Sequence, residues 1–159
     1  MSAKKGNSPM DYALSYLTSR DRTVWEMQTY LEEKEFGESD VDQTIGRLTE
    51  LGLLSDRKYA EQFIRTRLAT KPVSKSHLYR QLAEHHVPSE IITEFLAKIP
   101  EENELQNAVE IAAKFYRQFQ SLEPKTRRMR VLSRLEARGF RFDVSQRAYE
   151  KAQANTEEE

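Results

Sequence analysis

The sequence contains no cysteine, and it has only five glycines and five prolines among its 159 residues. Without cysteine the chain can form neither disulfides nor thiolate metal sites, as is typical of proteins from a reducing compartment. No apolar run approaches the roughly 20 residues that span a bilayer, and the first ten residues, MSAKKGNSPM, lack the hydrophobic segment of a signal peptide. We therefore expect a cytoplasmic protein.

The sequence also lacks the motifs of the common catalytic and cofactor sites. It has no Gly-rich phosphate loop, no nucleophile elbow and no pair of histidines arranged with a carboxylate as metal ligands. His77 is isolated, and the neighbouring His85 and His86 have no carboxylate at the i+3 or i+4 spacing of helical metal sites. We therefore expect no enzyme activity, no metal and no cofactor, and we interpret the histidines as structural or solvated.

The composition can still supply a buried core, since 38% of the residues are hydrophobic and 32% are charged. A chain of 159 residues can bury about two-thirds of its unfolded surface, either as one domain or as a short array of small units. Because glycine and proline are scarce, long helices are favoured over a sheet-rich fold. The composition predicts a helical protein with a well-solvated surface.

The net charge of -1 hides an uneven distribution of charge along the chain. Residues 1–55 carry six basic and ten acidic side chains, whereas residues 56–100 carry eight and five. Residues 114–147 carry ten basic and three acidic side chains, a net charge of +7. This asymmetry indicates a polyanion or an acidic protein groove as the partner, and the charges do not choose between them.

A weak internal repeat runs through the sequence. The segments DYALSYL, KYAEQFI and QNAVEIA place Ala13, Ala60 and Ala108 at matching positions, 47 and 48 residues apart. Each alanine is followed three and four residues later by large or apolar side chains, as on one face of a helix. A second segment of each repeat carries an apolar pair at i and i+4, and these pairs are Met27 with Leu31, Leu78 with Leu82, and Val131 with Leu135.

A third helix is predicted in each repeat, where polar residues that can cap a helix precede an apolar one. These starts are Ser39-Asp40-Val41, Ser89-Glu90-Ile91 and Asp143-Val144. The predicted repeats are residues 10–54, 55–100 and 101–152, between an N-terminal tail at 1–9 and an acidic tail at 153–159, and we expect both tails to be disordered. Units of roughly 45 residues must share buried surface to be stable. We therefore predict an all-α fold, a tandem array of three three-helix repeats that is elongated and curved.

Basic side chains outside the predicted core form the candidate binding surface. In KTRRMRVLSRLEARGFRFD (125–143), Arg128, Val131 and Leu135 share the core face, and the other arginines follow one another in steps of three or four. Like charges at this spacing repel by a few tenths of a kcal/mol per pair, so an anionic partner explains them better than helix stability does. The predicted partner-binding residues are Arg57, Lys58, Arg65, Arg67, Lys71, Lys75, Arg80, Arg127, Arg130, Arg134, Arg138 and Arg141.

Two glycines and the single tryptophan receive structural interpretations. Gly139 follows the basic segment and predicts a helix stop, whereas Gly46 lies inside a predicted helix and is interpreted as a mark of close helix packing. Trp25 is interpreted as a packing residue of the core or of a contact between repeats. The interleaved Arg, Gly and aromatic residues of single-strand binding surfaces do not surround it.

Two stretches, GLLSDRKYAEQFIRTR and RLEARGFRFDVSQRAYEKA, resemble the RecX family of recombinase regulators. The family has a leucine pair before one or two Asp, then Tyr-Ala and an aromatic-Ile/Val pair; near its end it has Arg-Gly-Phe/Tyr, then Asp and an apolar residue. The matching residues are Leu53, Leu54, Asp56, Tyr59, Ala60, Phe63, Ile64, Arg138, Gly139, Phe140, Asp143 and Val144. Where many relatives have a glycine-containing basic turn, this chain has ATKPVSKSH. The resemblance covers residues 10–152.

The resemblance implies a non-catalytic regulator. RecX-like proteins are tandem three-helix repeats that lie in the groove of the filament formed by a RecA-type recombinase on single-stranded DNA. There they bridge protomers and limit strand exchange, ATP hydrolysis and co-protease activity. By this resemblance the chain would modulate homologous recombination, DNA repair and the SOS response. It would act as a monomer that reaches DNA mainly through the filament and binds DNA only weakly by itself.

Two other functions fit the same residues. The outer arginines also fit a direct DNA-binding protein of the helix-turn-helix type, which would bind bare duplex tightly and with a steep salt dependence. A helical scaffold for a different acidic protein would affect neither recombinase filaments nor bare DNA. Titration into recombinase filaments and into bare DNA separates the three functions.

Overall fold

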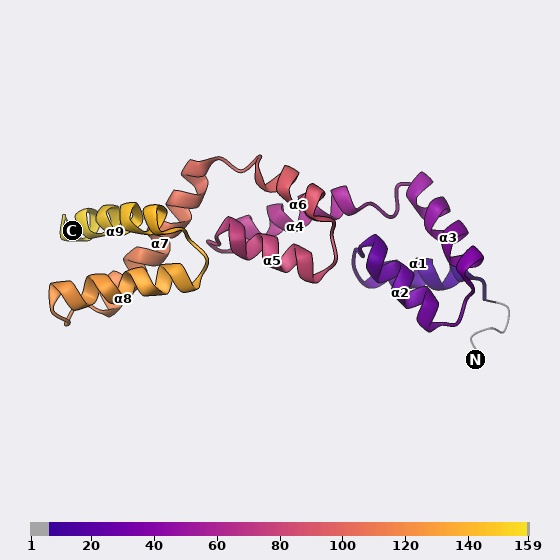
Figure 1. Ribbon diagram of the computed structural model, residues 1–159, viewed down its shortest axis with the longest axis horizontal. Coiled ribbons are helices and arrows are strands. Elements are labelled where there is room, and N and C mark those ends of the chain that lie inside the picture. The colour runs from indigo at the N-terminus through magenta and orange to yellow at the C-terminus, as the bar shows by residue number, and fades with distance from the viewer. Residues whose placement is uncertain (1–6, 159) are drawn as a thin grey trace. The chain divides into compact units, whose positions relative to one another are not determined.

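The computed structural model describes residues 7–158, and every regular element within them is an α-helix (Figure 1). The helices are α1 (Pro9–Ser19), α2 (Val24–Glu33), α3 (Glu38–Glu50), α4 (Asp56–Thr70), α5 (Lys75–Glu84), α6 (Ser89–Leu96), α7 (Glu101–Gln118), α8 (Pro124–Ala137) and α9 (Phe142–Glu157). No strand occurs in this part of the chain, which confirms the predicted all-α fold. In chain order the helices form three groups of three, α1–α3, α4–α6 and α7–α9.

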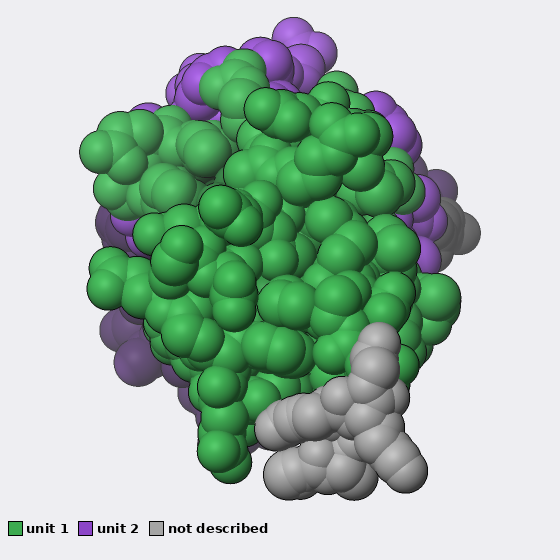
Figure 2. Space-filling model, turned by 90° about the vertical axis from the view of Figure 1, so that its right-hand side faces the viewer, with its two compact units in different colours: residues 1–63, 82–92 green, residues 64–81, 93–159 purple. Residues whose placement is uncertain are grey.

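The chain divides into two compact units, which Figure 2 shows in different colours. Unit 1 comprises residues 1–63 and 82–92, and unit 2 comprises residues 64–81 and 93–159. The division passes through α4, α5 and α6, so the middle group of helices contributes residues to both units.

In unit 1, helices α1, α2 and α3 pack around one apolar core. Ala13, Met27 and Leu31 are fully buried, as the repeat pattern predicted. Phe36 and Ile45 are partly buried and pack against this cluster. Burying a large aliphatic side chain stabilises a fold by about 1.5–3 kcal/mol, so these periodic positions supply much of the stability of the unit.

In unit 2, helices α7, α8 and α9 enclose a larger core. Val131, Leu135 and Phe140 are buried at the positions that the repeat pattern predicted. Helix α7 packs most extensively on α9. Ala108 and Ala148, on these two helices, are fully buried, and such small side chains let two helix backbones approach closely.

The predicted caps of two third helices are wrong by one or two positions. Helix α3 begins at Glu38 after Gly37, and α9 begins at Phe142 after Arg141, neither with a side-chain cap. Asp143 lies in the first turn of α9, where its negative charge is favourable near the helix N-terminus. Acidic residues favour both the cap and the first turn, so the motif locates a helix start only approximately.

The predicted disorder of residues 153–159 is wrong for most of that segment, because α9 continues to Glu157. The Glu157 carboxylate accepts hydrogen bonds from the Tyr116 hydroxyl at 3.1 Å and from the Gln153 amide at 3.2 Å. The first bond joins the last turn of α9 to α7, and the second lies within α9 and stabilises that turn. The sequence shows no apolar periodicity there because the stabilising contacts are polar.

The predicted N-terminal tail is also shorter than residues 1–9. Ser8 and Asp11 form a capping box at the start of α1, in which each side chain accepts the backbone amide of the other. Pro9 occupies the first turn, where its missing amide hydrogen costs nothing. The rest of the predicted tail, residues 1–6, lies outside the described residues.

Gly46 does not mark close helix packing, which corrects the interpretation from the sequence. It lies within α3 and is exposed, and a Cβ atom added there would meet nothing within 4 Å. Glycine in such a place only adds conformational freedom to the unfolded chain. We expect Gly46→Ala to raise the free energy of unfolding by about 0.5–1 kcal/mol, as measured by urea denaturation. A loss of stability would mean that α3 needs the glycine for a contact.

Candidate partner-binding surface

Helix α2 begins at a joint between the first and second repeats, inside unit 1. Thr23 is fully buried; its hydroxyl accepts the Glu26 amide at 3.1 Å, and the Glu26 carboxylate accepts the Thr23 amide at 3.1 Å. The Thr23 hydroxyl also donates to the carbonyl of His85, just beyond α5, at 2.8 Å. One threonine therefore caps α2 and joins two repeats.

A carboxylate from α4 makes the second bond of this joint. The Val24 amide donates to Asp56 Oδ1 at 2.9 Å. The hydroxyl of Ser55 accepts the Lys58 amide at 3.2 Å, so Ser55 is the residue that caps α4 and Asp56 faces the first repeat. Burial raises the pKa of the Asp56 carboxyl; the bond from Val24 opposes this effect and the neighbouring Glu26 carboxylate adds to it.

Two histidines complete the joint in unit 1. His85 Nδ1 lies 2.8 Å from Glu26 Oε2, and its ring packs edge-on against Phe63 with the centroids 5.8 Å apart. Trp25 is 46% exposed and stacks on His86 with a centroid distance of 3.6 Å. The interpretation of Trp25 as a packing residue between repeats is therefore confirmed. His85 does have a carboxylate partner, but it comes from another repeat and not from its own helix.

A second joint lies in unit 2, between the second and third repeats. Ser74 is fully buried; its hydroxyl accepts the His77 amide at 3.1 Å and donates to the Arg138 carbonyl at 2.7 Å. The Lys75 amide donates to Glu104 Oε2, in the first turn of α7, at 2.6 Å. Ser74 therefore caps α5 and joins it to the end of α8.

The two joints use the same chemistry. In each joint, the residue that caps the second helix of one repeat donates its hydroxyl hydrogen to a backbone carbonyl at the end of the second helix of the next repeat. Thr23 donates to His85, 62 residues later, and Ser74 donates to Arg138, 64 residues later. In each joint, the backbone amide of the residue after the cap donates to a carboxylate in the first turn of the next repeat's first helix. The amide of Val24 donates to Asp56, 32 residues later, and that of Lys75 donates to Glu104, 29 residues later. A buried polar group left unpaired costs about 1–3 kcal/mol, so these bonds select one register of neighbouring repeats.

Gly139 closes the joint in unit 2. Its φ is +93°, a conformation that favours glycine, and its carbonyl accepts the Ser76 hydroxyl at 2.9 Å. A Cβ atom at this position would lie 2.7 Å from Ser74 Oγ and would also collide with the Ser76 hydroxyl. The predicted helix stop is confirmed, and the close approach of α5 gives a second reason for glycine.

Three exposed arginines, two on α8 and one at its C-cap, lie beside two buried phenylalanines, one on α7 and one at its C-cap. We call Arg130, Arg134 and Arg138 the arginine stripe. The Arg130 guanidinium lies 5.9 Å from the centroid of the Phe119 ring, and that of Arg134 lies 5.4 Å from the same centroid. The Arg138 guanidinium lies 4.8 Å from the Phe115 centroid. Positions four residues apart lie about 6 Å apart along a helix axis, so the three arginines form a row, and their contacts with the rings restrain the guanidinium groups while the side chains stay exposed.

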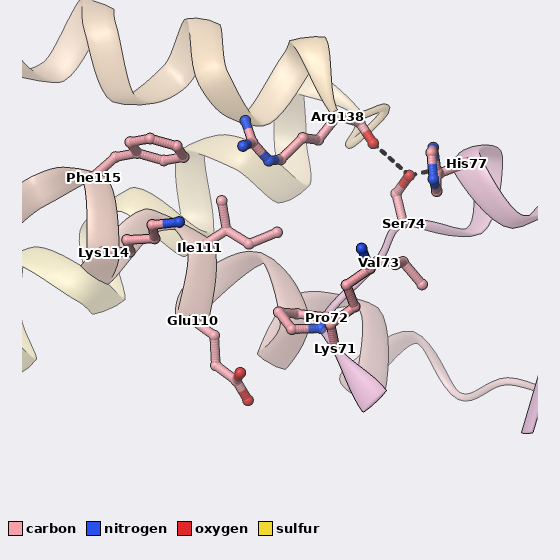
Figure 3. A pocket seen from close by; sticks show the side chains of 10 residues that line it. All are labelled: Lys71, Pro72, Val73, Ser74, His77, Glu110, Ile111, Lys114, Phe115 and Arg138. Atoms are coloured by element: carbon pink, nitrogen blue, oxygen red, sulfur yellow. Dashed lines mark hydrogen bonds between the residues drawn. The ribbon is translucent and has the colours of Figure 1, made fainter. Parts of the chain in front are cut away.

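A pocket of about 530 Å³ lies at the Arg138 end of the arginine stripe, inside unit 2 (Figure 3). Its lining residues are Lys71, Pro72, Val73, Ser74, His77, Glu110, Ile111, Lys114, Phe115 and Arg138. Lys114 Nζ lies 5.5 Å from the centroid of the Phe115 ring, which Arg138 also contacts. Three cationic side chains and one carboxylate therefore surround an apolar surface.

Arg127 was predicted to lie on the outer basic face, but the structure gives it internal contacts. Its side chain is half-buried; Nη1 donates to the Tyr116 hydroxyl at 2.7 Å and Nη2 donates to the Leu122 carbonyl at 3.3 Å. The first bond holds α8 on α7, and the second ties α8 to the connection that precedes it. Arg128, assigned to the core face, is also half-buried, and its guanidinium lies 5.1 Å from the Tyr149 ring centroid.

The other predicted partner-binding residues differ in exposure and in grouping. Arg141 is exposed and pairs with Asp143 at 3.4 Å. Arg67 and Lys75 are half-buried, and the remaining predicted residues outside the arginine stripe are exposed, namely Arg57, Lys58, Arg65, Lys71 and Arg80. The pocket brings Lys71 and Arg138 together with Lys114, which the prediction missed although Lys114 begins the segment with a net charge of +7.

Within residues 7–158, no helix is long and apolar enough to cross a membrane. The same part of the chain contains no group of three or more His, Cys, Asp or Glu side chains that could hold a metal ion.

Comparison with protein-family models finds two matches in succession. The RecX first three-helix domain matches residues 10–48, and the RecX second three-helix domain matches residues 55–96. The regulatory protein RecX of Trichlorobacter lovleyi is 30% identical over 150 residues, which cover 91% of this chain and 97% of that protein. The regulatory protein RecX of Bacillus pumilus is 28% identical over 156 residues, and the chain spans 58% of its length.

Solved structures show the same fold. The crystal structure of RecX from Lactobacillus salivarius matches with a TM-score of 0.87 and 20% identity, over 92% of this chain and 95% of that chain. A second crystal structure, of a regulatory protein RecX, matches with a TM-score of 0.77 and 22% identity, over 87% of this chain and 68% of that chain. The likeness and the two domain matches confirm the predicted tandem three-helix fold.

Proposed function

The chain belongs to the RecX family, and from this premise we propose that it is a non-enzymatic regulator of a RecA-type recombinase. It binds the filament that the recombinase forms on single-stranded DNA and restrains strand exchange, ATP hydrolysis and co-protease activity. The role is that of a cytoplasmic monomer that reaches DNA mainly through the filament. It belongs to homologous recombination, DNA repair and the SOS response.

The arginine stripe is the observation that carries this proposal. Arg130, Arg134 and Arg138 are held in a row on one side of α8, although each adjacent pair repels by a few tenths of a kcal/mol. Their contacts with aromatic rings fix the positions of the charges without neutralising them. Such a preorganised row suits the acidic surface of a protein filament, or the phosphates beside it, since less side-chain entropy is lost on binding.

The exposed basic residues of α4 and α5 extend the proposed contact surface beyond the stripe. They are Arg57, Lys58, Arg65 and Arg80, with Lys71 between the two helices. Arg127 is left out of the proposed surface because its guanidinium already bonds to Tyr116 and Leu122. Many separate contacts along successive repeats can give affinity without one dominant residue.

The test is titration of the protein into recombinase filaments on single-stranded DNA, with the DNA-dependent ATPase rate as the readout. We expect the wild-type protein to lower the rate. We expect Arg130→Glu/Arg134→Glu to need at least about tenfold more protein for the same effect, since each reversal replaces attraction by repulsion. Absence of any effect of the wild-type protein at saturation would rule out the proposed function.

A matched control is available on α9. Arg147 and Lys151 are exposed, lie four residues apart and belong to no proposed contact surface. The variant Arg147→Glu/Lys151→Glu has the same net charge as the stripe variant and should inhibit the filaments like the wild type. Equal weakening by both variants would mean that only net charge acts. Tight binding of the wild type to bare duplex with a steep salt dependence would instead favour direct DNA binding.

A further inference from the structure

The pocket in unit 2 combines two kinds of surface that neither the repeat core nor the arginine stripe has alone. Lys71, Lys114 and Arg138 place positive charge at its edge, where all three side chains are exposed. Ile111 and Phe115 lie buried beneath them and expose part of their apolar surface to the pocket. Figure 3 shows Lys114 and Phe115 on α7 with the Arg138 side chain beside them. A ligand that fits must therefore be both anionic and partly apolar.

A nucleic-acid backbone fits this pocket poorly. Glu110 also lines the pocket, and its negative charge lowers the attraction of the site for a phosphate. Sugar and phosphate also offer little apolar surface to the buried side chains below. A peptide can place carboxylates beside the cations, a backbone amide beside Glu110 and an apolar side chain in the space between them. About 530 Å³ is within the range of pockets that hold small ligands and single side-chain anchors.

We propose that this pocket binds an acidic peptide segment of the partner protein, with one aromatic or large aliphatic side chain seated over Ile111 and Phe115 and flanking carboxylates on Lys71, Lys114 and Arg138. This inference rests on the proposed function, because it names the chemistry by which part of the recombinase filament would be held. The arginine stripe carries the wider charge attraction, and the pocket selects the segment.

The joint in unit 2 explains why the pocket has a fixed shape. Ser74 lines the pocket and bonds to the Arg138 carbonyl at 2.7 Å, a bond that Figure 3 draws as a dashed line. The Asn107 side chain donates to the Val73 carbonyl at 3.2 Å, from α7. These two bonds hold the segment before α5 against the other two elements that line the pocket. A preorganised pocket loses less entropy when a flexible peptide binds.

The test uses the full purified chain and a fluorescently labelled peptide of about ten residues, in which one phenylalanine is flanked by two acidic residues on each side. A second peptide has glycine in place of phenylalanine, and a third has glutamine in place of every acidic residue. We expect the first peptide to bind at least about tenfold more tightly than either of the others. Fluorescence anisotropy measures the three affinities, and a single-stranded oligonucleotide of about 15 nucleotides is used as competitor.

The variant Lys114→Glu/Arg138→Glu should weaken binding of the first peptide at least about tenfold, while Arg147→Glu/Lys151→Glu should leave it unchanged. The single variant Lys114→Glu, on an exposed position, should weaken binding in the same direction if the double variant misfolds. Equal binding of the phenylalanine and glycine peptides, or equal affinity of both double variants, would overturn the proposal. So would an oligonucleotide that binds in the pocket while the peptide does not. If the wild-type protein binds the first peptide but does not inhibit recombinase filaments, the proposed function is wrong and the peptide-binding pocket stands.

Discussion

Gly139→Ala is expected to lower the free energy of unfolding of unit 2 by about 2–5 kcal/mol. An alanine at a φ of +93° carries strain of about 1–2 kcal/mol. Its Cβ would also displace the hydroxyls of Ser74 and Ser76, each of which donates to a carbonyl at the end of α8. Disturbing two such bonds costs about 0.5–1.5 kcal/mol each. Urea denaturation followed by circular dichroism measures the total.

Gly52→Ala is the matched control for this prediction. Gly52 has a φ of +75°, but a Cβ atom there would meet only Lys58 Nζ, at 3.4 Å, and the flexible end of a lysine can move away. This variant should carry the strain alone, about 1–2 kcal/mol. Equal losses of stability in the two variants would show that the approach of α5 to Gly139 adds nothing. A larger loss for Gly139→Ala assigns the difference to the joint.

The buried core could be predicted from the sequence because helical periodicity records which positions face inward. Ala13, Met27 and Leu31 were placed by spacing alone, and all three are fully buried. A side chain at i+4 lies on the same helix face whatever the helix packs against. The core of each repeat is therefore a local property of the sequence. The same local rule fails for α9, whose last turn is held by polar contacts of Glu157.

The joints between repeats could not be predicted, because their partners are distant in sequence. Thr23 looks like any helix cap, and nothing near it in the chain points to the carbonyl of His85, 62 residues later. Asp56 looks like a cap as well, yet it accepts the amide of Val24, and Ser55 caps α4. A cap motif indicates that a hydrogen-bonding group is present. It does not say which of several free amides or carbonyls the group will meet in the folded chain.

The candidate surface was only partly predictable, because arginines with one spacing have two different environments. Arg130 and Arg134 are exposed beside Phe119, as expected for an outer face, whereas Arg127 turns to the hydroxyl of Tyr116. The spacing of residues along a helix gives the direction of a side chain. It does not show whether the neighbouring helix places a hydrogen-bond acceptor there. Lys114 was missed for the same reason, since only the packing of α7 beside α8 brings it to Arg138.

Thr23→Ala is expected to lower the free energy of unfolding of unit 1 by about 2–4 kcal/mol. Loss of the cap of α2 costs about 1 kcal/mol. The part-buried hydrogen bond to the carbonyl of His85 is also lost, and an acceptor left unpaired away from water costs about 1–3 kcal/mol. Urea denaturation measures the change. Hydrogen exchange of the amides of α2 and of the segment around His85 should show that both open more often in the variant.

Ser8→Ala separates the two contributions. Ser8 forms the same reciprocal capping box with Asp11 at the start of α1, but it is exposed and its side chain bonds within its own helix turn. This variant should cost only about 1 kcal/mol and should leave exchange around His85 unchanged. Equal costs at Ser8 and Thr23 would reduce the joint in unit 1 to an ordinary cap. A larger loss of stability for Thr23→Ala than for Ser8→Ala would show that the Thr23 hydroxyl both caps α2 and stabilises the contact between the first and second repeats.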